Sequence, residues 1–217
     1  MSSPPKTLRV VIADDHRFYR QGLASLLKNF DIEVVGEASN GVAAIEIVRE
    51  TAPDVVVMDL NMPRLSGLEA TRRLIEDTPA IRVLVVSVSE QGEDLTDAIL
   101  AGASGYVLKD RPVEEVVAGI RAAAAGESLI SPGIASMLLL RIRDREQAEP
   151  DLPRIPLSER ELLVLTLVAE GKTSHEIGAA LTIDPSTVRD HISSTLMKLQ
   201  IDERGRAAAR AGHDRMA

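Results

Sequence analysis

The first 125 residues alternate between two kinds of segment, and this alternation limits the fold more than any other feature of the chain. One kind is short, apolar and rich in β-branched residues, which is typical of buried strands. These segments are Leu8–Ala13, Glu33–Glu37, Val55–Met58, Ile81–Val86 and Tyr106–Leu108. The other kind has apolar residues at helical spacing, over Arg17–Asn29, Val42–Glu50, Gly67–Asp77, Asp94–Ala101 and Val113–Ala125. Five strand–helix units in series predict an α/β fold with a doubly wound, five-stranded parallel sheet.

The composition changes after residue 125. Ile134–Ile142 has helical spacing, and three prolines, Pro150, Pro153 and Pro156, follow within seven residues of one another. Because proline fixes its own φ and restricts the residue before it, these prolines predict a stiff, extended linker. We therefore expect a first domain over residues 1–125, a helical and proline-rich linker over 126–156, and a second domain over 157–217.

The last 60 residues predict a small all-α domain. Two capping boxes, Ser158–Glu161 and Thr173–Glu176, each precede an apolar helical run, and Gly171 ends the first run. Asp184, which is followed by a proline, predicts the start of a third helix that runs to about Leu199. Three helices with a short turn before the last form a helix-turn-helix.

Polar side chains end several of the predicted strands. Asp14 and Asp15 follow the first strand, and Asp59 follows the third. In a doubly wound sheet these strands are neighbours and their carboxyl ends form the functional edge, so a hard cation such as Mg²⁺ is expected to relieve the repulsion between the carboxylates. Lys109 follows the fifth strand and Ser87 ends the fourth, at the same edge. These residue types suit phosphoryl transfer to a carboxylate, where catalysis is mainly positioning and charge neutralisation.

Each of these residues also has an ordinary structural interpretation. Asp14 or Asp15 alone is typical of a helix cap, and Asp59 alone is typical of a turn. A single lysine such as Lys109 is usually solvated, and a single tyrosine such as Tyr106 usually packs in a half-buried position. The joint occurrence of the required residue types at four strand ends favours a functional site over these separate interpretations.

Four segments, VIADDHR, VVMDLNMPRLSGLE, VLVVSVSE and AGASGYVLKD, closely resemble the receiver domains of two-component response regulators. The resemblance covers roughly residues 7–125 and implies a flavodoxin-like fold. It implies that a sensor histidine kinase phosphorylates Asp59. It also implies Mg²⁺ ligands at Asp15, Asp59 and the backbone carbonyl of Asn61, with Asp14 acting through water.

The same resemblance implies roles for three residues on the last two strands. Lys109 would contact the phosphoryl group, and Ser87 would move to form a hydrogen bond with it. Tyr106 would swing inward as Ser87 moves. Such a receiver catalyses its own phosphorylation and slow hydrolysis, but it is not a dedicated enzyme.

The segment LSERELLVLTLVAEGKTSHEIGAALTIDPSTVRDHISSTLMKLQI resembles the DNA-binding domain of LuxR-type regulators, over about residues 156–205. Together with a receiver, it is typical of the NarL/FixJ class. The last helix is expected to enter the major groove of double-stranded DNA. We expect phosphorylation either to favour a homodimer or to release the DNA-binding domain, and we expect RNA polymerase as a further partner. The residues expected to contact DNA are Lys172, Thr187, Arg189, Asp190, His191, Ser193 and Lys198.

The charge of the chain limits how it holds DNA. The formal net charge is −8, and residues 157–217 contain eight Lys/Arg and nine Asp/Glu. Asp190 adds a carboxylate to the expected recognition helix, where it repels phosphate but can accept a hydrogen bond from a cytosine amine. We therefore expect weak binding by a monomer and stronger binding by a dimer on two half-sites. The same features motivate a rival hypothesis, in which the chain is a phosphorylated adaptor whose helical domain binds a protein.

Other function classes fit the sequence poorly. No Gly-rich phosphate loop follows any predicted strand, which argues against a nucleotide-dependent enzyme. The second half has no aromatic residue, so it lacks the stacking surfaces of single-stranded nucleic acid binders. Cysteine is absent, which excludes disulfides and favours a reducing cytoplasm. No apolar stretch approaches the ~18 residues that a membrane span needs.

Overall fold

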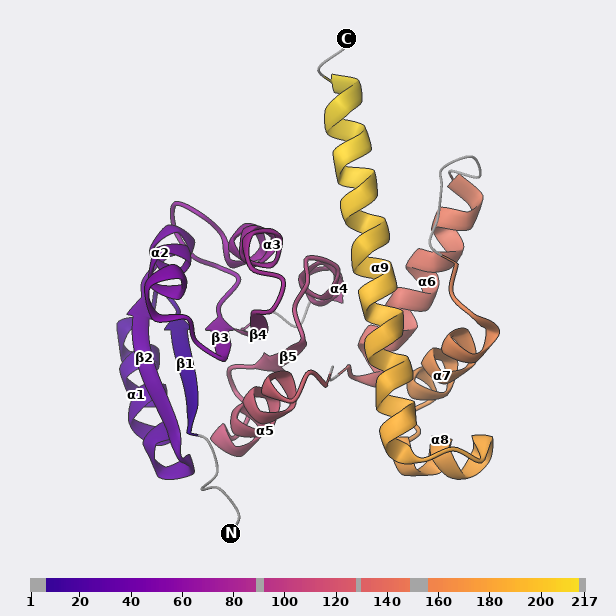
Figure 1. Ribbon diagram of the computed structural model, residues 1–217, viewed down its shortest axis with the longest axis horizontal. Coiled ribbons are helices and arrows are strands. Elements are labelled where there is room, and N and C mark those ends of the chain that lie inside the picture. Colours follow the sequence, from indigo (N-terminus) through magenta and orange to yellow (C-terminus); the bar gives the residue numbers. More distant parts are fainter. Residues whose placement is uncertain (1–6, 89–91, 128–129, 149–155, 215–217) are drawn as a thin grey trace. The chain divides into compact units, whose positions relative to one another are not determined.

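The computed structural model describes residues 7–88, 92–127, 130–148 and 156–214 of the chain. Two compact units are present (Figure 1). Residues 1–90 and 102–129 form one unit, and residues 91–101 and 130–217 form the other. The linker prolines Pro150 and Pro153 lie outside the described residues.

The first unit contains a five-stranded parallel sheet with strand order β2-β1-β3-β4-β5 (Figure 1). The strands are β1 (Leu8–Ala13), β2 (Ile32–Ala38), β3 (Val55–Met58), β4 (Arg82–Ser87) and β5 (Gly105–Leu108). Because β2 lies on one side of β1 and the later strands lie on the other, the strand order reverses at β1. This is the doubly wound arrangement that the sequence predicts, with its switch point beside Asp14.

Helices cover both faces of this sheet. Helices α1 (Arg17–Leu27) and α5 (Val113–Ala124) pack on one face, and α2 (Gly41–Thr51) and α3 (Gly67–Asp77) pack on the other. Two of these helices begin at side-chain caps. The Asn40 side chain accepts a hydrogen bond from the Ala43 amide, and the Ser66 hydroxyl accepts one from the Glu69 amide. Such caps satisfy backbone N–H groups that have no partner within the helix.

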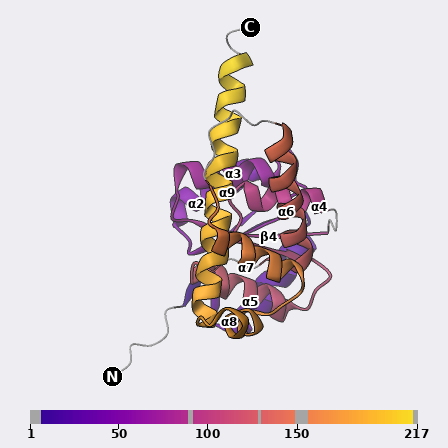
Figure 2. The ribbon, with the colours of Figure 1, turned by 90° about the vertical axis from the view of Figure 1, so that its right-hand side faces the viewer.

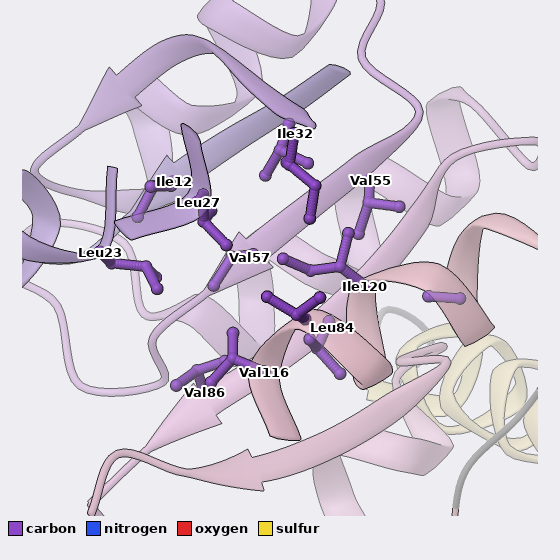
Figure 3. Close-up of a cluster of buried hydrophobic side chains, with 13 residues drawn as sticks. Ile12, Leu23, Leu27, Ile32, Val55, Val57, Leu84, Val86, Val116 and Ile120 are labelled. Atoms are coloured by element: carbon purple, nitrogen blue, oxygen red, sulfur yellow. The ribbon is translucent and has the colours of Figure 1, made fainter. Parts of the chain in front are cut away.

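A cluster of buried apolar side chains forms the core between the sheet, α1 and α5 (Figure 3). Ile12, Val57 and Leu84 project from three neighbouring strands toward Leu27 of α1 and Ile120 of α5, and each of the five is at most 2% exposed. Alternate strand residues share a face because the side-chain period of a strand is two. Full burial of one such side chain stabilises the fold by about 1.5–3 kcal/mol, so this layer holds the strand ends in place.

The second unit is helical (Figure 2). Its helices are α4 (Gly92–Leu100), α6 (Pro132–Ala148), α7 (Glu159–Ala169), α8 (Ser174–Leu181) and α9 (Pro185–Asp214). Helices α7, α8 and α9 pack together, and their buried side chains include Leu165, Ile177, Val188 and Leu196. Helix α6 contacts α7, and α4 contacts α6 and α9. The three-helix arrangement expected for the last part of the chain is therefore present.

Two helices are longer than the sequence predicts. The helix expected over Ile134–Ile142 extends from Pro132 to Ala148. The prediction that the last helix ends near Leu199 is wrong, because α9 continues to Asp214. Four alanines and three arginines, which favour helix, lie between Leu199 and Asp214, and the two glycines in this stretch, Gly205 and Gly212, do not interrupt the helix.

Candidate functional site

The register of the sheet brings Asp14 and Asp59 together. Ala13 pairs with Met58 at the ends of β1 and β3, so the residues that follow leave the sheet side by side. The Asp59 amide donates to the Ala13 carbonyl at 2.8 Å, and the Asp14 amide donates to the Ala38 carbonyl at 3.0 Å. Both residues are only 2% exposed. Two buried carboxylates therefore share the carboxyl edge of the sheet.

Lys109 joins these two carboxylates. Its Nζ lies 2.6 Å from Asp14 Oδ2 and 2.9 Å from Asp59 Oδ2, and its side chain is 9% exposed. The lysine backbone is fixed as well, because its amide donates to the Ser87 carbonyl at 2.9 Å. The ammonium group offsets part of the repulsion between the carboxylates, as expected for a buried like-charge pair.

One oxygen of Asp59 lacks a partner. Oδ1 is buried and forms no hydrogen bond with any described residue. Burial raises the pKa of Asp59 above its usual value, whereas the hydrogen bond and charge of Lys109 lower it. A buried acceptor without a partner costs about 1–3 kcal/mol, so this oxygen is well placed to accept an incoming cation or phosphoryl group.

The acidic cluster fits a divalent cation. Ligand atoms of Asp14, Asp15, His16 and Asp59 all lie within 4.8 Å of one another. Asp15 is exposed, and its Oδ1 lies 2.8 Å from His16 Nδ1. A set dominated by carboxylate oxygens, together with the buried Oδ1 of Asp59, matches what Mg²⁺ prefers. Asn61, which the resemblance also names, is exposed on the segment after β3.

The other predicted receiver residues lie on β4 and β5. Ser87 is fully buried at the end of β4 and pairs with Leu108 of β5. Tyr106 is half-buried and pairs with Val85. The pairing of β4 with β5 therefore places Ser87 beside the residue that precedes Lys109.

Three features of this site are not predicted from the sequence. His16 was not among the expected ligands, although it directly follows the two aspartates. Gly67 begins α3 so close to β3 that a Cβ there would lie 1.8 Å from the Asp59 carbonyl oxygen, which only glycine permits. The Tyr19 ring lies under Lys109, with Nζ 4.9 Å from the ring centroid.

In the helical unit, both expected capping boxes are present. Ser158 with Glu161 begins α7, and Thr173 with Glu176 begins α8. The Asp184 carboxylate accepts from the Ser186 amide at 2.8 Å, so the expected cap of α9 is also present. These caps explain why three helices begin where the sequence predicts.

The turn between α8 and α9 is tight. Thr182 has a left-handed backbone with φ of 56°, and the Ile183 amide donates to the Gly178 carbonyl at 3.0 Å. A Cβ at Gly178 would lie 2.7 Å from the Ile183 carbonyl oxygen. The close approach of α8 to this turn therefore depends on a glycine.

The predicted DNA-contacting residues differ in exposure. Asp190 and Lys172 are exposed, and a group on α9 is partly exposed. The partly exposed residues are Thr187, Arg189, His191, Ser193 and Lys198. Val188 and Ile192 are buried on the opposite side of the helix. The first turns of α9 thus have an apolar side in the core and a polar side that faces outward.

Lys198 has a partner within the fold. Its Nζ lies 2.8 Å from Glu161 Oε2, and the Ser194 hydroxyl donates to Glu161 Oε1 at 2.7 Å. Glu161 is 4% exposed. Burial raises its pKa, but hydrogen bonds from Lys198, Ser158 and Ser194 outweigh this and lower the pKa to about 2. The carboxylate therefore ties the start of α7 to the middle of α9.

Comparison with known proteins identifies the family of each part. Residues 10–121 match the response regulator receiver domain. Residues 155–211 match the bacterial regulatory proteins of the luxR family. This chain belongs to the LuxR-type response regulators. As in this family, its function is phosphorylation-dependent regulation of transcription.

Relatives align with nearly the whole response regulator. This chain is 39% identical to the transcriptional regulatory protein LiaR of Bacillus subtilis, over 94% of this chain and 96% of the relative. It is 36% identical to the nitrate/nitrite response regulator protein NarL of Escherichia coli strain K12, over 95% and 96% of the two chains.

Solved structures of response regulators are similar to this chain as well. The response regulator ChrA of a heme-sensing two-component system has a TM-score of 0.52 at 33% identity, over 97% of this chain and 99% of that one. The receiver domain of the putative response regulator NarL from Mycobacterium tuberculosis has a TM-score of 0.54 at 33% identity, over 56% and 99%. In the described ranges of this response regulator, no helix combines the length and apolar composition that a bilayer span requires.

Proposed function

We propose that Asp59 is the phosphoacceptor of this response regulator. The proposal rests on the different contacts of the two Asp59 carboxylate oxygens. Oδ2 is held by Lys109 at 2.9 Å, whereas Oδ1 is buried without a partner among the described residues. In the reaction, an Asp59 oxygen attacks the phosphorus of a donor, an O–P bond forms, and the bond from phosphorus to the leaving group breaks. The donor in the cell is a phosphohistidine of a sensor histidine kinase.

The residues of the chain have separate roles in this step. Asp15, Asp59 and the backbone carbonyl of Asn61 would hold Mg²⁺, with Asp14 acting through water; the bound ion would neutralise charge on the phosphoryl oxygens. Lys109 leaves its position between the carboxylates to pair with a phosphoryl oxygen. The site speeds its own phosphorylation and hydrolysis, without the turnover of a dedicated enzyme.

The phosphoryl group adds nearly two negative charges beside Lys109. Ser87 moves to donate a hydrogen bond to it, and Tyr106 swings inward into the space that Ser87 leaves. These movements change the surface formed by β4, β5 and their helices and favour a homodimer. The domains of this mechanism are the receiver over 1–125, the linker over 126–156 and the DNA-binding domain over 157–217.

The output is binding of double-stranded DNA by α9. Its first turns enter the major groove, and the dimer contacts two half-sites. The residues proposed at the DNA are Lys172, Thr187, Arg189, Asp190, His191, Ser193 and Lys198. RNA polymerase is the further partner through which bound protein changes transcription.

The phosphoacceptor is tested with acetyl phosphate and Mg²⁺. The wild-type chain is expected to gain one phosphoryl group, measured by intact mass, and Asp59→Asn is expected to gain none. Asp110→Asn is the matched control, because Asp110 is an exposed carboxylate next to Lys109. Stable phosphorylation of Asp59→Asn at the wild-type level would refute the assignment.

A further inference from the structure

Tyr19 contacts the lysine of the phosphorylation site. It lies in the first turn of α1, half-buried, and its ring centroid is 4.9 Å from Lys109 Nζ. An ammonium over the face of a tyrosine ring is attracted by the negative face of the ring, and the attraction grows when the pair is shielded from water. Lys109 is 9% exposed. The contact is therefore in the stronger part of the range for such pairs.

The ring completes the surroundings of the ammonium. Asp14 and Asp59 bind Nζ at 2.6 and 2.9 Å, and Tyr19 lies against it as a third group. A lysine side chain has many rotamers, and fixing it costs up to about 2 kcal/mol of conformational entropy. A rigid aromatic ring beside Lys109 restricts its rotamers already in the folded protein. Less conformational entropy is then lost when the ammonium is positioned for phosphoryl transfer.

A cavity adjoins both Tyr19 and Lys109. Its volume is about 280 Å³, and it is lined by residues of α1, by Lys109 and Arg111, and by residues of α5. Its walls include Phe18, Tyr19, Leu23, Lys109, Val113 and Val116. If Tyr19 were aliphatic, the ammonium would lose the attractive ring face and the lysine would gain space in which to turn away from Asp59.

We propose that Tyr19 is a positioning residue of the phosphorylation site, which holds the Lys109 ammonium facing Asp59 and thereby sets the rate of phosphoryl transfer. This inference rests on the proposed function of Asp59. It concerns the ring rather than the hydroxyl group. Burial, followed by the charges of Asp14 and Asp59, raises the pKa of Tyr19 to about 12, so the ring is a neutral phenol at any physiological pH.

The test compares variants of Tyr19 in the full chain. Tyr19→Phe keeps the ring, whereas Tyr19→Leu and Tyr19→Met remove it. Phosphorylation by acetyl phosphate with Mg²⁺ is followed by intact mass. Loss of a partly buried cation–π contact is expected to slow phosphorylation by about 2- to 30-fold in the two aliphatic variants. Tyr19→Phe is expected to stay within about twofold of wild type, since the ring face remains.

Two controls separate positioning from general damage. Phe18 is next to Tyr19 on α1, lines the same cavity and is 92% exposed. Phe18→Leu therefore removes a neighbouring aromatic ring but leaves the contact between Tyr19 and Lys109 in place. It is expected to match wild type. In a Lys109→Met background, Tyr19→Leu is expected to have no further effect, because two residues that act through one contact are not additive.

The outcomes distinguish this inference from the proposed function. If wild type gains no phosphoryl group, the function proposed for Asp59 fails. If wild type is phosphorylated on Asp59 and either folded aliphatic variant reacts at the wild-type rate, the role of Tyr19 is wrong. It is equally wrong if Tyr19→Leu slows the reaction as much in the Lys109→Met background as in wild type.

Discussion

The Glu161 carboxylate combines burial with an unusual number of donors. Its two oxygens accept hydrogen bonds from the Ser158 amide and hydroxyl, the Ser194 hydroxyl and Lys198. Ser158 belongs to the capping box of α7, whereas Ser194 and Lys198 belong to α9. A single side chain therefore both caps the start of α7 and ties it to the middle of α9.

We expect Glu161→Gln to lower the free energy of unfolding by about 1–3 kcal/mol, because hydrogen bonds to a charged acceptor are lost and Lys198 loses its counter-charge. The effect depends on pH. The folded pKa of Glu161, about 2, lies below its usual value of 4.5. The contribution is therefore complete above pH 4.5 and is lost as pH falls toward 2. Urea unfolding of both proteins at pH 7 and pH 3 measures this.

The difference between wild type and Glu161→Gln should shrink by more than half at pH 3. Glu159→Gln is the control, because Glu159 is an exposed acid in the same first turn of α7. A difference that is equal at the two pH values would show that the ionised form of Glu161 is not what stabilises the fold.

At the scale of helices and strands, the sequence predicts beginnings better than ends. Capping boxes and a proline after Asp184 mark the starts of α7, α8 and α9, because each cap is a local pattern of two or three residues. No comparable pattern marks the end of α9, so the sequence does not predict its extension to Asp214. Strand positions were predicted to within about one residue, since buried strands of a parallel sheet are continuous apolar runs.

The turn between α8 and α9 supplies a prediction at the same scale. Gly178→Ala would place a Cβ 2.7 Å from the Ile183 carbonyl oxygen, which is backbone and cannot rotate away. We expect a loss of about 1–3 kcal/mol in the free energy of unfolding, typical of overpacking, together with weaker DNA binding. Gly205→Ala in α9 has no neighbour within 4 Å and should stabilise the helix by up to about 1 kcal/mol.

Thermal unfolding and duplex binding of the two glycine variants test this prediction. If Gly178→Ala is as stable as Gly205→Ala and binds duplex DNA like wild type, the turn tolerates a side chain and the glycine is not required for the geometry of α9.

At the scale of the whole molecule, the sequence predicts which residues come together when strand order alone determines their position. Asp14, Asp59 and Lys109 converge because the ends of parallel strands share an edge, and this needs no knowledge of side-chain conformation. The contacts of Tyr19 with Lys109 and of Glu161 with Lys198 were not predictable in this way. Each joins elements far apart in the sequence, and its existence depends on rotamers and packing that no local pattern records.

The charge of the molecule decides how strongly DNA binding should depend on salt. With a net charge of −8, the protein is repelled by DNA except where a local cationic group faces a phosphate. Each phosphate contact releases a counterion, so the logarithm of the binding constant should fall by about 0.9 per contact for each unit of the logarithm of salt concentration. Exposed Asp190 on α9 opposes this attraction.

We therefore expect Asp190→Asn to bind random duplex DNA several-fold more tightly than wild type at low salt, with the gain disappearing as salt rises, because screening removes the repulsion that the carboxylate exerts. Asp110→Asn changes the net charge equally in the other unit and should bind like wild type. Fluorescence anisotropy across a salt series, with and without acetyl phosphate, measures the DNA affinity of both variants.

Binding that is undetectable in either phosphorylation state, while Asp59 is demonstrably phosphorylated, would favour the rival hypothesis. In that hypothesis the chain is an adaptor that uses its helical domain to bind a protein.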